Sequence, residues 1–369
     1  MNDIRVPQSD LDDLTDRLTR TRWPAEAPGD YGITVARVRA LADTWLHFDW
    51  RAHEAELNAI PHATTEIDGD RVHYFHARNG DPKALPLLLT HGWPGSTVEF
   101  LDVIGPLSEH FHVVAPAIPG FGLSGPTTRP WGVDRVARAW AELMTRLGYR
   151  HFGAQGGDWG SGISRSLGHQ FPERVAGVHV NYLPTPGTAD DLTPTDQARL
   201  AKTMHLAANR HPHQILFAAT PQTPAYALTD SPAGLLAFLA ERFDTWADPA
   251  TPVPDARIVA NVAHHWLFRT AGSAARIVKE SAPATPAPTS SGPAPAPTGS
   301  QPPLPVPFGV AVLPGDIVQP VRPIAARTHD IRHWTEFPRG GHFPALEVPD
   351  LFTADVTAFF QQVTPQPPN

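Results

Sequence analysis

The segment 156–160 reads Gly-Gly-Asp-Trp-Gly and directly follows the apolar run 149–154. This pattern is typical of a nucleophile elbow, a sharp strand-to-helix turn whose small residues let the backbone bend and expose the central side chain. Here the central residue is Asp158. A carboxylate suits attack on an sp3 carbon, because water can cleave the resulting alkyl ester, whereas serine would leave an inert ether. The residue type predicts alkyl transfer, against the plainer alternative of an acid in an ordinary Gly-Asp turn.

A second loop supplies candidate donors for an oxyanion. The segment 91–96 reads His-Gly-Trp-Pro-Gly-Ser and follows the strand-like segment 85–90. We expect the backbone N–H groups of Trp93 and Trp159 to face the ester carbonyl of Asp158. In that position they would stabilise the oxyanion that forms when the ester is hydrolysed.

A general base and its orienting acid are expected further along the chain. His342 lies in an Arg-Gly-Gly-His-Phe-Pro loop, between a strand-like segment at 331–337 and a helical pattern at 349–360. Asp316 follows the strand-like segment 308–313 in a Pro-Gly-Asp turn. The chain order nucleophile, acid, histidine predicts that Asp316 orients the His342 imidazole and stabilises its charged form.

The elements that must position these residues follow from the hydrophobic pattern. Strand-like and helical segments alternate from residue 71 onward, which predicts a mostly parallel sheet with helices on both faces. We expect strands at 72–76, 85–90, 111–115, 149–154 and 175–180, and helices at 97–109, 133–147 and 161–171. Together with the loops this predicts an α/β-hydrolase fold with an inserted helical cap.

The domain organisation follows from the same pattern. We expect an N-terminal extension at 1–70, a first part of the core at 71–184, a helical cap at 185–280, a linker at 281–305 and a second part of the core at 306–369. The linker is rich in Ala, Pro, Thr and Ser and carries no charge. Such a composition cannot bury a core, so we expect a tolerated surface insertion rather than a device that moves the cap.

These motifs make the chain similar to the microsomal-type epoxide hydrolases of the α/β-hydrolase superfamily. The resemblance covers nearly the whole chain, including an N-terminal extension that wraps around the catalytic domain in relatives. It implies that Asp158 is the nucleophile, His342 the base and Asp316 the charge-relay acid, and that segment 91–96 is the family's oxyanion loop. It also implies hydrolysis of a small-molecule epoxide to a vicinal diol, without a cofactor.

The chain departs from this family in the cap. Relatives carry two cap tyrosines that donate hydrogen bonds to the epoxide oxygen as the ring opens. Counting from Pro-Gln-Thr at 221–223 places His213 at the first position, and Val278 falls at the second. We expect His213 to act as the donor, partly protonated because the reference pKa of histidine is about 6.5. Tyr226, Tyr182 and His265 are weaker candidates.

Composition narrows the class of protein. The net charge is −8, which argues against nucleic acid or an anionic membrane as the main partner. There are no cysteines, so disulfides and thiolate metal sites are excluded. The histidine pairs at 211/213 and 264/265 lack a nearby third ligand, so we expect no metal. Without an apolar leader or membrane span we expect a cytoplasmic protein, with a homodimer among the open oligomeric states.

Three alternatives to epoxide hydrolysis stay open at this point. A haloalkane dehalogenase-like reaction would need no tyrosines, because a halide leaves without a proton. An epoxide-opening cyclase of secondary metabolism would use an internal hydroxyl group in place of water. A non-catalytic binding protein could keep the fold without turnover, although the set of Asp158, Asp316 and His342 argues against it.

Overall fold

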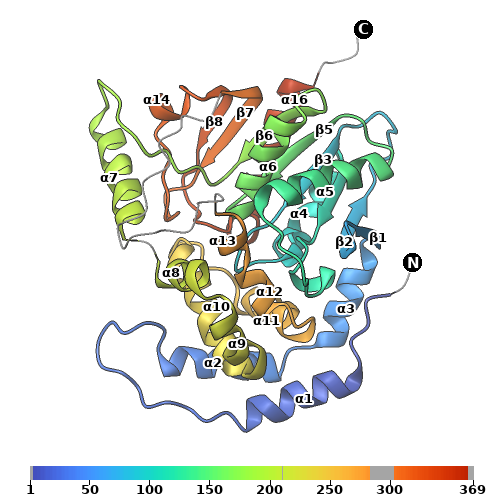
Figure 1. The fold of residues 1–369 in the computed structure, drawn as a ribbon, viewed down its shortest axis with the longest axis vertical. Coiled ribbons are helices and arrows are strands. Elements are labelled where there is room, and N and C mark those ends of the chain that lie inside the picture. Colours follow the sequence, from blue (N-terminus) through green and yellow to red (C-terminus); the bar gives the residue numbers. More distant parts are fainter. Residues whose placement is uncertain (1–2, 210, 283–302, 365–369) are drawn as a thin grey trace, which may run out of the picture.

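The computed structural model describes residues 3–209, 211–282 and 303–364. An eight-stranded sheet in the order β1-β2-β4-β3-β5-β6-β7-β8 forms its centre (Figure 1). β1 and β2 run antiparallel to their neighbours, and the strands from β4 to β8 along this order are parallel. The strands are β1 (His62–Ile67), β2 (Asp70–Ala77), β3 (Pro86–Thr90), β4 (His112–Pro116), β5 (Phe152–Gly156), β6 (Val175–Val180), β7 (Leu304–Val312) and β8 (His329–Glu336). The sheet confirms the predicted fold class.

Helices cover both faces of the sheet, as its buried central strands require. Alternate residues of β3 point to opposite faces: Leu88 packs with the cluster that contains α5 and α6, and Leu87 and Leu89 pack with the cluster that contains α4 and α16. The core helices and 3-10 turns are η1 (Thr97–Phe100), α4 (Leu101–Ser108), η2 (Gly122–Ser124), α5 (Val133–Arg146), α6 (Trp159–Gln170), α14 (Arg322–Ala325), α15 (Pro344–Glu347) and α16 (Pro349–Val363).

The segment between β6 and β7 holds the cap helices. They are α7 (Pro194–Ala208), α8 (Pro212–Ala219), α9 (Gln222–Asp230), α10 (Pro232–Trp246), α11 (Asp255–Leu267), α12 (Ala271–Ala275) and α13 (Ile277–Glu280). Most of the predicted linker, 283–302, lies outside the described residues.

The N-terminal extension contributes α1 (Gln8–Thr19), α2 (Val35–Leu46) and α3 (Trp50–Ala59). α1 and α2 pack on the cap helix α10, and α2 also packs on α11, so the extension lies along the outer side of the cap (Figure 1). β1 belongs to the same sequence range and was not predicted. The extension therefore joins the cap and the sheet edge.

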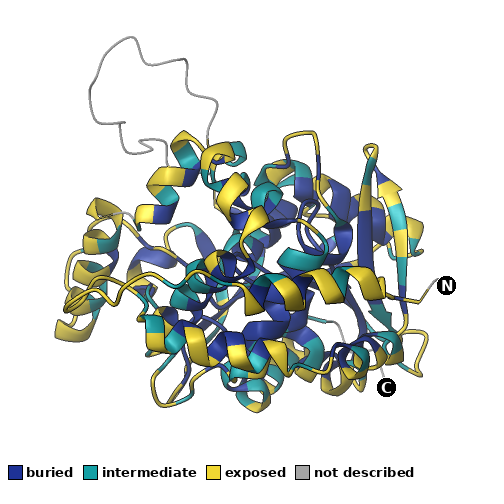
Figure 2. Cartoon of the chain, turned by 90° about the horizontal axis from the view of Figure 1, so that it is seen from below, coloured by how far each residue is buried: buried dark blue, intermediate teal, exposed yellow. Residues whose placement is uncertain are grey.

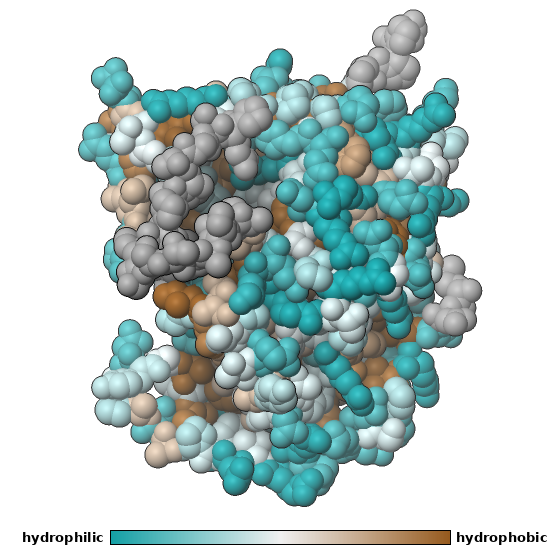
Figure 3. Space-filling model, viewed as in Figure 1, coloured by the Kyte–Doolittle hydropathy of each residue, from teal (hydrophilic) through white to brown (hydrophobic). Residues whose placement is uncertain are grey.

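The exposed surface is mainly polar. Figure 2 shows the buried residues gathered between the helices, whose outer sides are exposed. In the view of Figure 3, hydrophobic side chains appear only in separate areas among hydrophilic ones. Within the described ranges, no helix is both long enough and apolar enough to cross a membrane.

Candidate functional site

Asp158 lies at the turn between β5 and α6, with a φ of 48° and a ψ of −122°. A positive φ is uncommon for a residue with a side chain, and such strain concentrates at functional sites. Two glycines allow the tight packing below it. A Cβ on Gly160 would lie 1.9 Å from the carbonyl oxygen of Thr90, and a Cβ on Gly156 would lie 2.2 Å from that of Gly160. The local geometry is that of a nucleophile elbow with a carboxylate at its tip.

A backbone donor from the predicted oxyanion loop reaches this carboxylate. The N–H of Trp93 donates a hydrogen bond to Oδ1 of Asp158 at 3.0 Å. Trp159 is the first residue of α6, where backbone N–H groups have no partner within the helix. Among the described residues, the only backbone group bonded to the Asp158 carboxylate is the N–H of Trp93. The structure thus brings Trp93 to the nucleophile, and the role of Trp159 stays a prediction.

His342 connects the two predicted acids. Its Nε2 lies 3.4 Å from Oδ2 of Asp158, and its Nδ1 lies 2.8 Å from Oδ1 of Asp316. Burial opposes the charged imidazole, but Asp316 and then Asp158 outweigh it and raise the pKa of His342 to about 10. An ester on Asp158 would carry no charge, so alkylation would lower the pKa of His342. This change suits a base that is needed only after the ester has formed.

The loop that carries His342 is held from both sides by one carboxylate. Glu347 accepts hydrogen bonds from the N–H groups of Gly341 at 2.7 Å and Phe343 at 2.8 Å. The N–H of His342 itself donates to the carbonyl of Trp246 at 3.0 Å, at the end of cap helix α10. Burial raises the pKa of Glu347 to about 7 in spite of these bonds. Glu347 was not predicted from the sequence, where its place five residues after His342 was the available signal.

Two buried histidines hold the oxyanion loop. Nδ1–H of His91 donates to the carbonyl of Gly92 at 2.9 Å, and its Nε2 accepts from the N–H of Ile118 at 3.1 Å. Nε2 of His265 lies 3.0 Å from the carbonyl oxygen of Pro94, to which it donates. Burial lowers the pKa of each histidine to about 4. Both are therefore neutral structural groups, and His265 is not free to serve as the epoxide donor.

His213 lies over the oxyanion loop, on the side of the cap. Its ring stacks on the indole of Trp93, with centroids 4.6 Å apart and planes 22° apart. The indole of Trp246 lies 5.6 Å from His213 and 5.0 Å from the imidazole of His342. Nδ1 of His213 and Nε1 of Trp246 are buried and have no hydrogen-bond partner among the described residues. Two rings that each carry an unpaired nitrogen therefore lie beside Trp93 and His342, the two residues that contact Asp158.

The prediction that His213 is partly protonated at neutral pH is wrong. Burial, with smaller contributions from Arg242 and His211, lowers the pKa of His213 to about 3. The ring is therefore neutral at pH 7 rather than partly charged. A neutral imidazole can still donate one N–H to a developing negative charge, as neutral histidine electrophiles do.

The structure also separates the other candidate donors. The structure contradicts the prediction for Tyr226, because its side chain points to solvent on α9 and the residue is 73 % exposed. The ring of Tyr182 lies 5.4 Å from that of His342, and burial, together with Asp158 and Asp316, raises the pKa of Tyr182 well above its usual value. Val278 is half-buried on α13, which packs against the helix α8 of His213. The second predicted tyrosine position thus carries no side-chain donor.

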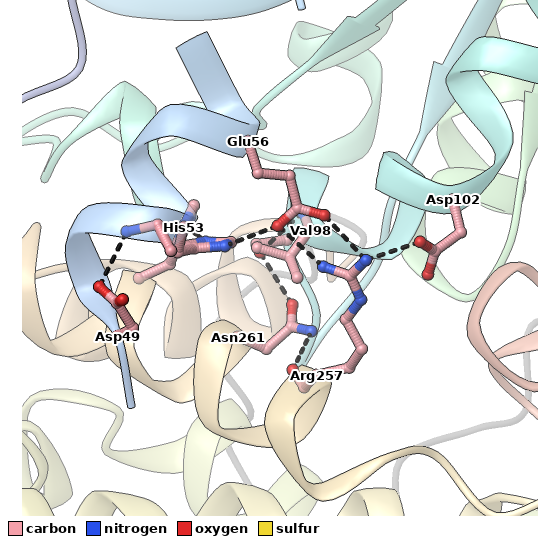
Figure 4. Close-up of polar contacts among 10 residues, drawn as sticks. Asp49, His53, Glu56, Val98, Asp102, Arg257 and Asn261 are labelled. Atoms are coloured by element: carbon pink, nitrogen blue, oxygen red, sulfur yellow. Dashed lines mark hydrogen bonds and ion pairs between the residues drawn. The ribbon is translucent and has the colours of Figure 1, made fainter. Parts of the chain in front are cut away.

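The extension, the cap and the oxyanion loop are joined by a polar network (Figure 4). Arg257 of α11 bonds Glu56 of α3 at 2.9 Å and Asp102 of α4 at 2.6 Å. Asn261, one turn further along α11, accepts a hydrogen bond at 2.8 Å from the hydroxyl of Ser96, the last residue of the oxyanion loop. The cap helix α11 is therefore attached both to the extension and to the loop that carries Trp93.

No metal site is apparent in the part of the chain that the structure describes, where no three His, Cys, Asp or Glu side chains are arranged to hold an ion. The rings of His211 and His213 stack 5.5 Å apart. Nε2 of His264 lies 3.1 Å from Nε2 of His53. The predicted absence of a metal or cofactor stays a prediction.

Comparisons with known proteins agree with this geometry. Residues 1–100 match the family described as Epoxide hydrolase N terminus, and residues 86–202 match the alpha/beta hydrolase fold. A Stigmatella aurantiaca protein named "Putative epoxide hydrolase" is 39 % identical over 98 % of this chain and 84 % of its own length. Epoxide hydrolase 1 of Oryctolagus cuniculus is 28 % identical over 96 % of this chain and 87 % of its own length.

A solved structure extends the similarity to three dimensions. The structure of Aspergillus niger epoxide hydrolase superposes with a TM-score of 0.86 and 28 % identity, covering 98 % of this chain and 96 % of that chain. The juvenile hormone epoxide hydrolase of Bombyx mori shares the fold with the same TM-score at 24 % identity, covering 98 % of this chain and 94 % of that chain. Sequence, fold and site geometry agree, and the chain belongs to the epoxide hydrolase family of the α/β-hydrolase fold.

Proposed function

We propose that this protein opens an epoxide to a vicinal diol through a covalent ester on Asp158. The observation that carries the proposal is the set of contacts around this one carboxylate. Trp93 donates to its Oδ1 at 3.0 Å, and His342, held by Asp316, lies 3.4 Å from its Oδ2. The carboxylate of Asp158 extends from a strained backbone turn, with an oxyanion donor on one oxygen and a histidine beside the other. This arrangement suits formation and hydrolysis of an alkyl ester.

In the first step Oδ2 of Asp158 attacks one epoxide carbon from the side opposite the breaking C–O bond. The C–O bond of the ring breaks, and its electron pair stays on the oxygen. The resulting alkoxide accepts a hydrogen bond from the neutral ring of His213 and takes its proton from solvent. Trp246 is a second donor at the same place, because its indole N–H is buried and unpaired among the described residues.

In the second step His342 takes a proton from a water molecule, whose oxygen bonds to the ester carbonyl carbon of Asp158. The N–H of Trp93, with that of Trp159, stabilises the oxyanion of the tetrahedral intermediate. The intermediate collapses when the bond to the diol oxygen breaks, and this oxygen receives the proton from His342. Ionisation of the regenerated Asp158 returns to solvent the proton taken in the first step.

The test is to trap the ester. A His342→Gln variant keeps the nucleophile but lacks the base, so we expect the ester to accumulate. The variant is incubated with aryl, alkyl and polyketide-like epoxides, and the Asp158 peptide is examined by mass spectrometry. An Asp158→Ala, His342→Gln double variant is the matched control, because it cannot form the ester.

The expected result is an added mass equal to that of the epoxide on the Asp158 peptide, absent from the double variant. Absence of an adduct in folded protein across the panel would contradict the proposal. Halide release from chlorinated or brominated alkanes would then indicate a dehalogenase-like reaction. A cyclic ether free of label from heavy-oxygen water would indicate a cyclase. A cytoplasmic location and a homodimer stay predictions from the sequence.

A further inference from the structure

A small cavity adjoins Asp158 within the core. Its volume is about 20 Å³, and both Asp158 and His342 line it. A space of about 10–15 Å³ is enough for one water molecule when polar groups surround it. The remaining polar side chains in its wall are those of Thr90, Glu99, Gln155 and Asn181. The cavity can therefore hold a single water molecule in contact with the ester and the base.

Glu99 places a second carboxyl group in this wall. It lies in η1, directly after the oxyanion loop, and its position is fixed by close packing against that loop. A Cβ on Gly95 would lie 1.4 Å from Oε1 of Glu99, so only glycine leaves room for the carboxyl group. Burial raises the pKa of Glu99 to about 8; the nearby His342 opposes this shift and Asp158 adds to it. Neither step of the proposed reaction uses this group.

A water molecule that attacks an ester carbonyl needs acceptors for both of its hydrogen atoms. When both O–H bonds are directed to acceptors, a lone pair is left to face the carbonyl carbon. Nε2 of His342 is one acceptor, since it takes the proton in the hydrolysis step. A second acceptor must lie in the same cavity. Nε2 of Gln155 donates to Oδ1 of Asn181 at 2.9 Å. Oε1 of Gln155 is buried without a partner among the described residues and is the competing acceptor. Glu99 is the one carboxyl group in the wall besides Asp158.

We propose that Glu99 positions the hydrolytic water by accepting its second hydrogen. This inference rests on the proposed function, because it assigns a residue to the hydrolysis of the Asp158 ester. A carboxyl oxygen of Glu99 can accept this hydrogen bond in either protonation state of the group.

The test is a Glu99→Leu variant, which is of similar size but leaves no hydrogen-bond acceptor at this position. Steady-state rates and the alkylated fraction of the Asp158 peptide are measured with an epoxide that labels the His342→Gln variant. We expect kcat and KM to fall together by about a hundred-fold, because a misplaced reactant costs roughly that factor. The ratio kcat/KM should stay within about two-fold, because it reports alkylation alone.

The ester should then accumulate on Asp158 during turnover in this variant. A Glu109→Leu variant at the exposed residue that directly follows α4 is the matched control and should behave as the wild type. A Glu99→Asp variant should keep part of the hydrolysis rate, because it retains a carboxylate. Three results would overturn the inference.

The first is a Glu99→Leu enzyme that hydrolyses the ester at the normal rate, which would leave the second acceptor to Gln155. The second is slowed ester formation in that variant, which would assign Glu99 to the nucleophile instead of the water. The third is absence of any ester in the His342→Gln variant. Only this last result would also overturn the proposed function, so the two failures are distinguishable.

Discussion

The two sides of the active site differ in whether their ring nitrogens face a charged partner. On the sheet side, Asp158 accepts from Trp93, and His342 bonds to Asp316 and lies 3.4 Å from Asp158. Nε2 of His342 and Oδ2 of Asp316 form no further hydrogen bond among the described residues. On the cap side, Nδ1 of His213 and Nε1 of Trp246 are buried without a partner among the described residues. A buried unpaired donor costs about 1–3 kcal/mol. The sheet side is thus ready for ester hydrolysis, and the cap side requires a substrate atom to complete its hydrogen bonds.

The difference has a structural origin. Backbone geometry fixes the sheet side, because the elbow and the oxyanion loop follow the ends of the adjacent strands β5 and β3. Stacked rings fix the cap side, where His213 is held against Trp93. Val278 occupies the second position at which relatives carry a tyrosine. Changing one ring alters such a site without disturbing the sheet. We therefore expect variants on the sheet side to slow hydrolysis of the ester, and variants on the cap side to slow its formation.

The largest effect is expected from Asp316→Asn on the sheet side. An asparagine would no longer stabilise the charged imidazole of His342, so its pKa of about 10 would fall. We expect ester hydrolysis to slow by about 10⁴-fold, as for similar changes in other triads. Rapid-quench mass spectrometry should find the ester accumulating. An equal slowing of ester formation would break the comparison, because it would give Asp316 a role in both steps.

A smaller effect is expected from His213→Phe on the cap side. Phenylalanine keeps the stacking on Trp93 but removes the N–H, so we expect ester formation to slow by about 10²-fold. The measurement is the pre-steady-state rate at which the Asp158 peptide gains the mass of the substrate. Tyr226→Phe is the control and should leave this rate unchanged, because Tyr226 is exposed on α9. Full activity of His213→Phe would leave Trp246 as the main donor.

The sequence alone predicted most of the sheet side, because its residues occupy turns that directly follow strands. Helix α6 and strand β6 appear within two residues of their expected bounds, and the histidine, the acid and the nucleophile lie together as their order indicated. The geometry of the cap was harder to predict from the sequence. Whether Tyr226 faces the site or solvent depends on how α9 packs, and the neutral state of His213 depends on burial by distant segments.

The buried, neutral histidines on both sides of the site should make the free energy of unfolding depend on pH. Burial lowers the pKa of His91 and His265 to about 4 and that of His213 to about 3. The unfolded chain, with histidine pKa values of about 6.5, therefore binds more protons as the pH falls below that value. This contribution to stability is fully present above about pH 6.5 and is lost progressively toward pH 4. Each histidine contributes at most about 1.4 kcal/mol per pH unit.

Urea unfolding at pH 7, 6 and 5 tests this dependence. We expect the free energy of unfolding to fall with pH, and the slope to be shallower by about one proton in His213→Phe. His47→Gln is the control, because this side chain is 78 % exposed and its removal should leave the slope unchanged. Equal stability at pH 7 and pH 5 would contradict the neutral state assigned to the buried histidines.

The smallest effect is expected from Arg257→Ala, which tests whether the cap can be loosened without changing the chemistry. Arg257 joins Glu56 and Asp102, and its side chain is 20 % exposed (Figure 4). Because such partly exposed ion pairs are weak, we expect the free energy of unfolding to fall by only about 1 kcal/mol. Turnover should change less than about two-fold, because Asn261 still holds Ser96. The exposed pair of Arg332 and Asp330 offers Arg332→Ala as a control without measurable effect. A large loss of turnover in Arg257→Ala would mean that the extension helps to position the oxyanion loop, and the sheet side would then depend on the cap.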